Sequence, residues 1–359
     1  MNNSVSTNRT VTPKSAMKAI DVALRHRRPL MLWGAAGIGK SDIVHQVAAQ
    51  SNRKVRDVRL ALWDPTDIKG IPYRGDDNLM HWSVPIELPT DPDCTDVLFL
   101  DELPSAPPAT QAAAYQLVLN RRVGNYVLPA GVDIVAAGNR RSDKGVTHEM
   151  PAPLANRFVH LELETSFEDF QEWAINNNIS SQVLGYLSFK KDDLHKFDPK
   201  SISRSFPSPR SWSFVSQLVQ DENCDERTLT DLVSGCIGDG TAVQFMAHRK
   251  ICHKLPSPTD ILEGKVTKVN TDEMSALSSL NVSLCYELNS LLKKIGRNKK
   301  WYAYVDKYLE FIMSGVFEAE LVVVGFKILM TTYKMDLDPS KLTQYSKFKK
   351  EYGSYILSA

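Results

Sequence analysis

The sequence predicts an α/β domain built on a parallel sheet with flanking helices, followed by an all-α domain and a helical C-terminal extension. Two observations predict this order. Up to about residue 164, short apolar runs alternate with helical segments, and several runs are apolar nearly throughout, which is typical of strands buried on both faces of a parallel sheet. After about residue 165 the strand signals stop.

The elements follow from local patterns. Residues 1–12 are polar and are expected to be flexible. A helix is predicted from Pro13, because Met17, Ile20 and Leu24 recur at helical spacing after a proline start. Five apolar runs are then predicted to be strands: residues 29–33, 55–62, 96–102, 132–139 and 158–164.

Helical patterns fill the rest of the chain, beginning with residues 166–177. Proline-rich breaks at residues 205–212 and 254–264 interrupt them. We therefore expect four parts: a flexible N-terminus (1–12), an α/β domain (13–164), a helical domain (165–254) and a helical extension (255–359).

Composition is that of an ordinary globular protein, with 24% charged residues and a formal net charge of +1, so no global field favours nucleic acid or a membrane. The start has no apolar signal region, and the apolar stretch 321–330 is too short to span a bilayer. We expect a cytoplasmic protein without membrane association. The cysteines are scattered, which favours reduced thiols over disulfides or a zinc site.

Residues 34–41, GAAGIGKS, fit the pattern G-x-x-x-x-G-K-[ST] between a predicted strand and a predicted helix. Such a loop points backbone N–H groups at phosphate oxygens, Lys40 can reach the β- and γ-phosphates, and Ser41 can bind Mg²⁺. A glycine-rich turn matching by chance is the alternative, which the flanking elements disfavour. The predicted ATP-binding residues are Gly34, Ala35, Ala36, Gly37, Ile38, Gly39, Lys40, Ser41 and Asp42.

Polar residues end two further predicted strands. Asp101 and Glu102 follow an apolar strand, where Asp101 can hold Mg²⁺ and Glu102 can polarise the attacking water. Asn139 ends another and could orient that water. Each signal is weak alone, since solvated acidic turns and Asn turns are common. Together they are stronger, because ligands of α/β sheets gather at the carboxyl ends of strands.

With these motifs, residues 13–215 resemble the AAA+ ATPases, and within them the MoxR branch. Residues 34–41 resemble Walker A, 97–102 Walker B and 136–139 sensor 1. The resemblance implies a P-loop AAA+ core with a helical lid. It places an arginine finger on Arg157, within MPAPLANRF, and sensor 2 on Arg210, within FPSPRSW. Two departures bear on the subfamily: Asn156 stands where Asp is frequent, and AAGN stands where TQNP is frequent.

The resemblance further implies a hexameric ring in which Arg157 acts on the neighbouring subunit's ATP; Arg140 and Arg141 are rival candidates for that role. It implies remodelling of a protein client, often with a partner bearing a von Willebrand factor A domain. A nucleic-acid motor of the same insert-bearing clade is the alternative, and a ring that binds ATP without turnover is a third possibility. Near-neutral charge disfavours the motor, so nucleic acid is not expected.

Two loops are candidate client contacts. The first is residues 67–78, which carry Tyr73 and overlap residues 62–73, the segment that resembles the opening of the family's helix-2 insert. The second is the predicted hairpin tip at 124–131, which carries Tyr126. Alternatively, both tyrosines only pack their loops. The basic and aromatic segment 291–308 could bind nucleic acid or an acidic partner, or be a solvated helix face. His45 and His148 have no metal-ligand spacing around them, and Mg²⁺ is the only metal expected.

Overall fold

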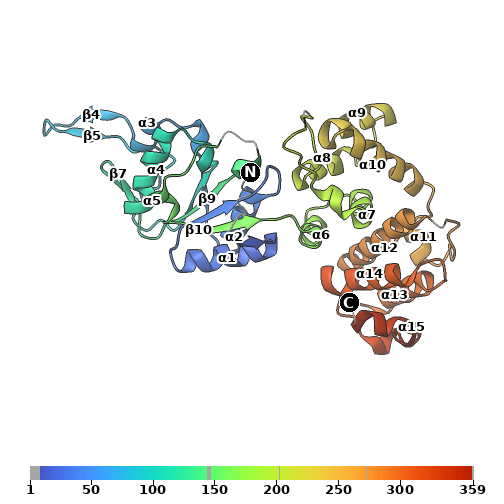
Figure 1. Ribbon diagram of the computed structural model, residues 1–359. Helices are drawn as coiled ribbons and strands as arrows, with labels where there is room; N and C mark the ends of the chain where they lie inside the picture. The colour runs from blue at the N-terminus through green and yellow to red at the C-terminus, as the bar shows by residue number, and fades with distance from the viewer. Residues whose placement is uncertain (1–8, 144–146, 202, 272, 358–359) are drawn as a thin grey trace. The chain divides into compact units, whose positions relative to one another are not determined.

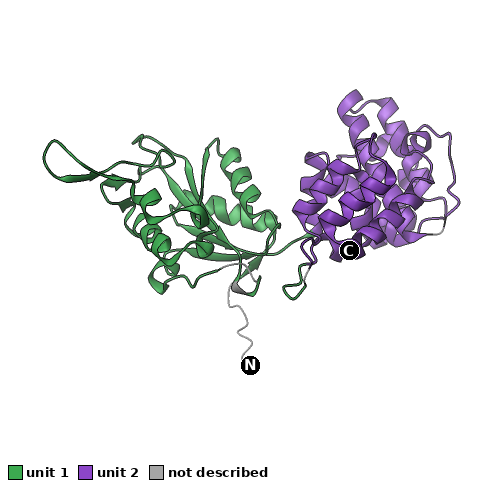
Figure 2. Ribbon diagram, turned by 90° about the horizontal axis from the view of Figure 1, so that it is seen from above, with its two compact units in different colours: residues 1–166, 197–201 green, residues 167–196, 202–359 purple. Residues whose placement is uncertain are grey.

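The computed structural model describes residues 9–143, 147–201, 203–271 and 273–357 (Figure 1). The chain divides into two compact units, which are described separately (Figure 2). Unit 1 comprises residues 1–166 and 197–201, and unit 2 comprises residues 167–196 and 202–359.

Unit 1 is built on a six-stranded sheet in which every described pairing is parallel, which confirms the predicted α/β class. In spatial order the strands are β1 (Thr10–Val11), β10 (Val159–Leu163), β2 (Leu30–Trp33), β9 (Asp133–Gly138), β6 (Val97–Asp101) and β3 (Val55–Arg59). The adjacent strands β9 and β6 are buried along their whole length, as expected for a sheet covered on both faces.

Helices cover the two faces of this sheet (Figure 1). Helices α1 (Pro13–Arg25) and α2 (Lys40–Gln50) share one core with alternate strand residues such as Leu32. Helices α3 (Pro65–Lys69), α4 (Pro108–Asn120) and α5 (Ala152–Ala155) lie over the other core, on the side of Met31. The short 3₁₀ turns η1 (Leu60–Leu62), η2 (Leu103–Ser105) and η3 (Arg141–Asp143) complete the connections.

At the two edges of the sheet, one predicted strand is shorter than expected and one short strand lies in a segment for which none was predicted. The strand expected over 55–62 ends at Arg59, because Arg59 already pairs with Asp101, the last residue of β6, and the chain then turns to bury Leu60. The segment expected to be flexible over 1–12 includes β1, which pairs with the outer edge of β10. Residues 1–8 of that segment lie outside the described residues.

Two hairpins interrupt the α/β order. The first, β4 (Pro72–Arg74) with β5 (Met80–Trp82), extends away from the sheet (Figure 1). The second, β7 (Arg122–Val123) with β8 (Tyr126–Val127), connects α4 to β9 and agrees with the predicted hairpin before Asn139.

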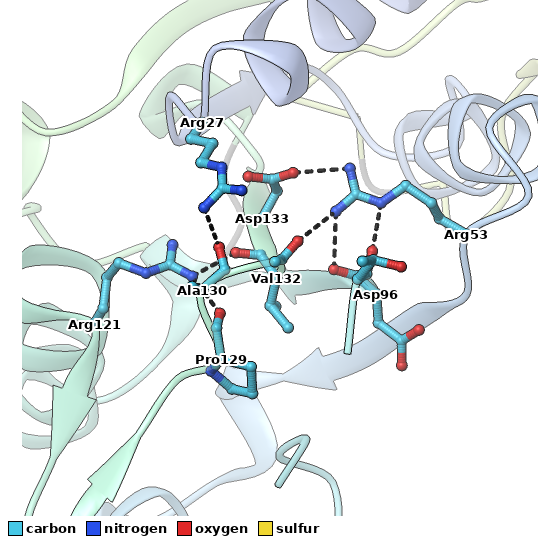
Figure 3. A network of polar contacts seen from close by, with 10 residues as sticks. Arg27, Arg53, Asp96, Arg121, Pro129, Ala130, Val132 and Asp133 are labelled. Carbon is cyan, nitrogen blue, oxygen red and sulfur yellow. Dashed lines mark hydrogen bonds and ion pairs between the residues drawn. The ribbon is translucent and has the colours of Figure 1, made fainter. Parts of the chain in front are cut away.

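Three arginines hold the connection from the second hairpin into β9 (Figure 3). Arg27 donates to the carbonyl of Ala130, and Arg121 donates to the carbonyls of residues 129 and 132. Arg53 donates to the carbonyl of residue 131 and pairs with Asp133 at 2.8 Å. Because these arginines follow three different helices, they fix the starting point of the strand that carries Asn139 at its far end.

The regular elements among the described residues of unit 2 are all helices, which confirms the predicted change of class after residue 165. Its elements share one hydrophobic core that extends from Phe167 to Phe348, with the long helix α12 packed on α7. The helical domain expected over 165–254 and the extension expected over 255–359 therefore lie largely in one compact unit. A domain boundary between residues 254 and 255 stays a prediction. The helices are α6 (Phe167–Asn176), α7 (Ser181–Phe189), η4 (Lys191–Leu194), α8 (Pro209–Leu218), α9 (Glu226–Ile237), α10 (Asp239–Cys252), α11 (Pro258–Leu262), α12 (Met274–Ile295), α13 (Lys299–Ile312), α14 (Ala319–Lys327), the π-helical η5 (Ile328–Thr332), η6 (Pro339–Lys341) and α15 (Tyr345–Leu357).

Among the described residues, no helix combines the length and the apolar character that crossing a membrane requires.

Candidate nucleotide-binding site

The candidate site lies where three neighbouring strands end. Strands β2, β9 and β6 are adjacent in the sheet and parallel, so their carboxyl ends meet at one edge. Strand β2 leads into the glycine-rich loop 34–39, β6 ends at Asp101, and Asn139 follows β9. The structure thus brings together the three motifs that the sequence separates, at the edge where α/β sheets bind ligands.

The glycines of the loop are required by its backbone. A Cβ on Gly34 would lie 2.5 Å from the Ile38 side chain and 3.2 Å from the Leu163 carbonyl oxygen. Gly37 and Gly39 have φ angles of 77° and 89°, which residues with a Cβ rarely adopt. The loop's first N–H, on Gly34, donates to the Gly138 carbonyl at 3.1 Å, which ties the loop to β9.

Helix α2 starts directly after this loop, and no side chain among the described residues caps its N-terminus at Gly39. The first N–H groups of a helix need acceptors, and the helix dipole favours an anion there. A phosphate in the loop would supply those acceptors. The backbone therefore fits the phosphate group that the sequence motif predicts. Asp42, exposed in the first turn of α2, stays a predicted contact.

Lys40 lies between the loop and the end of β9. Its Nζ donates to the carbonyl oxygens of Gly34 and Ala35 at 2.8 and 2.9 Å and to Oδ1 of Asn139 at 2.8 Å. These contacts hold the ammonium group beside the loop, within reach of the strand end that carries Asn139. A cation held there is suited to bind phosphate oxygens.

Ser41 and Asp101 also meet across the site, with Ser41 Oγ donating to Asp101 Oδ2 at 3.1 Å. The other carboxylate oxygen of Asp101 accepts the N–H of Glu102 at 2.9 Å, so the buried carboxylate is oriented by its own chain. A hydroxyl and a carboxylate are hard oxygen donors of the kind Mg²⁺ prefers. In the described ranges, no group of three or more His, Cys, Asp or Glu residues is placed to hold a metal ion. A Mg²⁺ bound by Ser41 and Asp101 would take its other ligands from phosphate oxygens and water.

Glu102 has a strained backbone, with a φ angle of 55° in the left-handed region. This conformation costs a residue with a Cβ about 1–2 kcal/mol. Its side chain is exposed next to buried Asp101. Strain of this kind concentrates at functional positions, and nothing in the sequence around Glu102 indicates it.

Sequence reasoning missed two residues of β3 beside the site. Arg59 pairs in the sheet with Asp101. The pKa of Asp57 is raised, first by burial and then by the negative charge of Asp101. Both residues approach the site only because β3 lies next to β6, an order that a single sequence does not reveal.

The predicted arginines are not gathered at this site. Arg157 is exposed, makes no side-chain hydrogen bond or ion pair within the described residues, and precedes β10. Val159 pairs with Leu30, the first residue of β2, whereas the glycine-rich loop follows the last. Arg157 therefore lies at the opposite edge of the sheet from Lys40.

The other arginines differ from Arg157. Arg140 is engaged within its own chain, 3.4 Å from Asp143 and 3.6 Å from Glu162. The side chain of Arg141 lies outside the described part of the chain. Arg210 is exposed in the first turn of α8, in unit 2, and its role toward the nucleotide stays a prediction.

No protein-family model and no curated protein matches the chain. Among solved structures it is similar to a mutant of RuvB from Thermotoga maritima, with 16% identity and a TM-score of 0.39 over 88% of this chain and 89% of that chain. It is also similar to NtrX from Brucella abortus (14%, TM-score 0.34, 90% and 69% covered). A third similar structure is a putative ATPase from Cytophaga hutchinsonii (10%, TM-score 0.34, 89% and 81% covered). Likenesses of this size assign neither a family nor an activity to the chain.

Proposed function

We propose that this protein is a Mg-ATP-hydrolysing AAA+ ATPase of the MoxR type that works as a ring on a protein client. The observation that carries the proposal is the meeting of Lys40 with Asn139 and of Ser41 with Asp101 at adjacent strand ends. A strand, a glycine-rich loop and a helix N-terminus complete the arrangement that phosphoryl transfer from ATP requires.

Each residue then has a defined task. The loop N–H groups and Lys40 bind the phosphates, and Ser41 and Asp101 hold Mg²⁺. When bound, the metal neutralises charge that develops on the phosphate oxygens. Glu102 accepts a proton from the attacking water, and Asn139 orients that water beside the γ-phosphate.

The position of Arg157 supports a ring. A guanidinium accelerates phosphoryl transfer by binding charge on the transferred group. Since Arg157 lies at the sheet edge opposite Lys40, we expect it to serve a nucleotide held by another copy rather than its own. Repetition of this head-to-tail contact closes into a ring, and the family resemblance suggests six subunits.

The hairpin β4–β5 supports contact with a protein client. Apolar side chains on and around it are exposed, namely Ile71, Tyr73, Leu79, Met80, Val84 and Ile86. Exposed apolar groups gathered on one element are typical of a protein-binding surface. A partner with a von Willebrand factor A domain belongs to the same proposal and rests on the family resemblance alone.

The alternative function, a nucleic-acid motor, has one observation in its favour. The end of α12, the start of α13 and the turn between them are exposed and carry Lys293, Lys294, Arg297, Lys299 and Lys300. If this turn contacts nucleic acid, DNA should stimulate ATP hydrolysis, and the stimulation should fall steeply with salt. The balanced net charge of +1 and the apolar hairpin favour the protein client.

Calorimetry and phosphate release with Mg-ATP test the proposal. The wild-type protein should bind and hydrolyse ATP, and Lys40→Ala should lose tight binding because the phosphates lose their main side-chain cation. Lys54→Ala, a lysine four residues beyond α2, is the control and should bind normally. Equal ATP affinity in Lys40→Ala and the wild type would refute the assignment of this site.

A further inference from the structure

Trp33 and His160 form an aromatic pair close to the candidate site. Trp33 is the last residue of β2, directly before the glycine-rich loop, and His160 lies on the neighbouring strand β10. Their planes are inclined by only 17° and their centroids lie 6.0 Å apart, so the two rings are nearly coplanar and meet edge to edge. The indole Nε1 of Trp33 lies 2.9 Å from Nδ1 of His160.

The second ring nitrogen of His160 reaches a different element. Nε2 lies 2.7 Å from the carbonyl oxygen of Ala155, the last residue of α5. An indole N–H can only donate and a carbonyl oxygen can only accept. His160 must therefore accept at Nδ1 and donate at Nε2, as a neutral ring with its hydrogen on Nε2. The ring bridges the end of β2 and the end of α5.

The Ala155 carbonyl is where the turn carrying Arg157 closes. It also accepts the N–H of Phe158 at 3.1 Å, and the N–H of Arg157 donates to the Leu154 carbonyl at 3.0 Å. The buried Phe158 ring meets the His160 ring edge-on. The backbone of residues 154–158, the Ala155 carbonyl and the Phe158 ring are thus held in place, while the Arg157 side chain stays exposed.

We propose that His160 is a positioning residue for Arg157. By holding the Ala155 carbonyl, it fixes the turn from which Arg157 projects, and Trp33 in turn fixes the tautomer and orientation of the imidazole. This inference rests on the proposed function, because the turn needs a fixed shape only if Arg157 must reach a neighbouring nucleotide. It adds two residues to that function which touch neither phosphate nor metal.

Two substitutions separate the contacts of the imidazole. In His160→Gln, the longer side chain can place its amide N–H near the position of Nε2 and keep the bond to Ala155. In His160→Asn, the shorter amide can meet Trp33 but cannot reach Ala155. Trp33→Phe is a third variant, which keeps a smaller aromatic ring on β2 and removes the N–H donor to Nδ1, and it tests the pair without changing His160.

Hydrogen exchange of the amides of residues 157 and 158 reports on the turn directly. It should be about tenfold faster in His160→Asn, close to wild type in His160→Gln and intermediate in Trp33→Phe, as expected for the loss of one hydrogen bond. Unchanged exchange in His160→Asn, or equal acceleration in the Asn and Gln variants, would overturn the proposal.

ATP hydrolysis gives the second readout. His160→Asn should lower kcat about tenfold with an unchanged Kd for ATP, whereas His160→Gln should keep kcat close to the wild-type value. In the Arg157→Ala background, neither substitution of His160 should lower kcat further. An additive loss in the double variant contradicts a positioning role. If Arg157→Ala alone hydrolyses normally, the proposed role of Arg157 fails, and the exchange result still decides whether His160 holds the turn.

Discussion

Lys40 and Asn139 are joined by a hydrogen bond of 2.8 Å between Nζ and Oδ1, although they lie ninety-nine positions apart in the sequence. The bond exists because β2 and β9 are neighbours in a parallel sheet and both run toward the same edge. It links the phosphate-binding loop to the strand end that is proposed to orient the attacking water. The candidate site is therefore one connected structure rather than three separate motifs.

Asn139→Ala should slow hydrolysis much more than it weakens binding. The variant keeps Lys40 with its two carbonyl partners, so ATP should bind within a few-fold of the wild-type Kd. Loss of the amide should lower kcat about 100-fold, the effect typical of removing one polar group that acts in the transition state. Single-turnover phosphate release measures this, with the exposed Asn120→Ala as control. Equal losses in the two variants would contradict the role of Asn139.

Glu102→Asn should make the protein more stable and inactive. Asn tolerates the left-handed backbone better than Glu, so the free energy of unfolding should rise by about 0.5–1 kcal/mol. Glu102→Gln is the matched variant, because it also removes the carboxylate but has no such backbone preference. Thermal unfolding and phosphate release should show both variants inactive and only the Asn variant stabilised. Identical melting temperatures would argue against strain at this position.

Tyr73 and Tyr126, the two tyrosines singled out in the sequence, should behave in opposite ways. Tyr73 is 53% exposed, whereas Tyr126 is 6% exposed and donates to the Pro89 carbonyl at 2.7 Å. Tyr73→Ala should leave basal hydrolysis and assembly unchanged but abolish stimulation by the client. Tyr126→Phe should cost about 1 kcal/mol of stability by leaving the buried carbonyl without its donor.

Client-stimulated and basal hydrolysis, measured in one preparation, check the role of Tyr73. Tyr355→Ala removes a tyrosine of the same exposed fraction, 53%, and should leave the stimulation intact. Full stimulation in Tyr73→Ala would remove this hairpin as the client contact, and loss of assembly would make the residue structural.

His248 should make unit 2 sensitive to mild acid. Burial lowers the pKa of this histidine from 6.5 to about 4. The unfolded chain therefore takes up a proton below pH 6.5, whereas the folded protein resists protonation until about pH 4. Stability should fall through this window, by about 2 kcal/mol at pH 5. Denaturant unfolding at pH 7 and pH 5 should show a smaller difference for His248→Gln than for the wild type.

The exposed His253→Gln is the matched control for His248 and should keep the full pH dependence. If His248→Gln loses as much stability between pH 7 and pH 5 as the wild type, other groups cause the acid sensitivity.

The sequence predicted the parts of this protein that depend on local pattern. The apolar strands, the loop glycines and the residues that end β6 and β9 are all visible in short windows. The order of the strands in the sheet is not visible in this way. The approach of Asp57 to Asp101 and the position of Arg157 at the far edge both depend on that order, so they could not be predicted either. Burial of Tyr126 was also open, because only tertiary packing decides whether an aromatic residue in a loop is covered.

Unit 2 illustrates a second limit. Proline-rich breaks suggested two helical parts, yet side chains on both sides of residue 254 share one core. Trp212 from α8 and Trp301 from α13 are both buried in it. A break in the helical pattern marks the end of an element, whereas a domain boundary depends on which apolar faces meet.

The central claim is that ATP is hydrolysed at a site that one subunit supplies with Lys40 and its neighbour completes with Arg157. Phosphate release from mixtures of Lys40→Ala and Arg157→Ala subunits tests it most directly. In the control mixture, Arg28→Ala takes the place of Arg157→Ala, because Arg28 is an exposed arginine at the same sheet edge. Each of the two variants alone should be inactive. In random rings, a site is complete when its own Lys40 and its neighbour's Arg157 are both intact, so an equal mixture should regain about a quarter of the wild-type rate. A mixture that stays as inactive as its components would contradict the account.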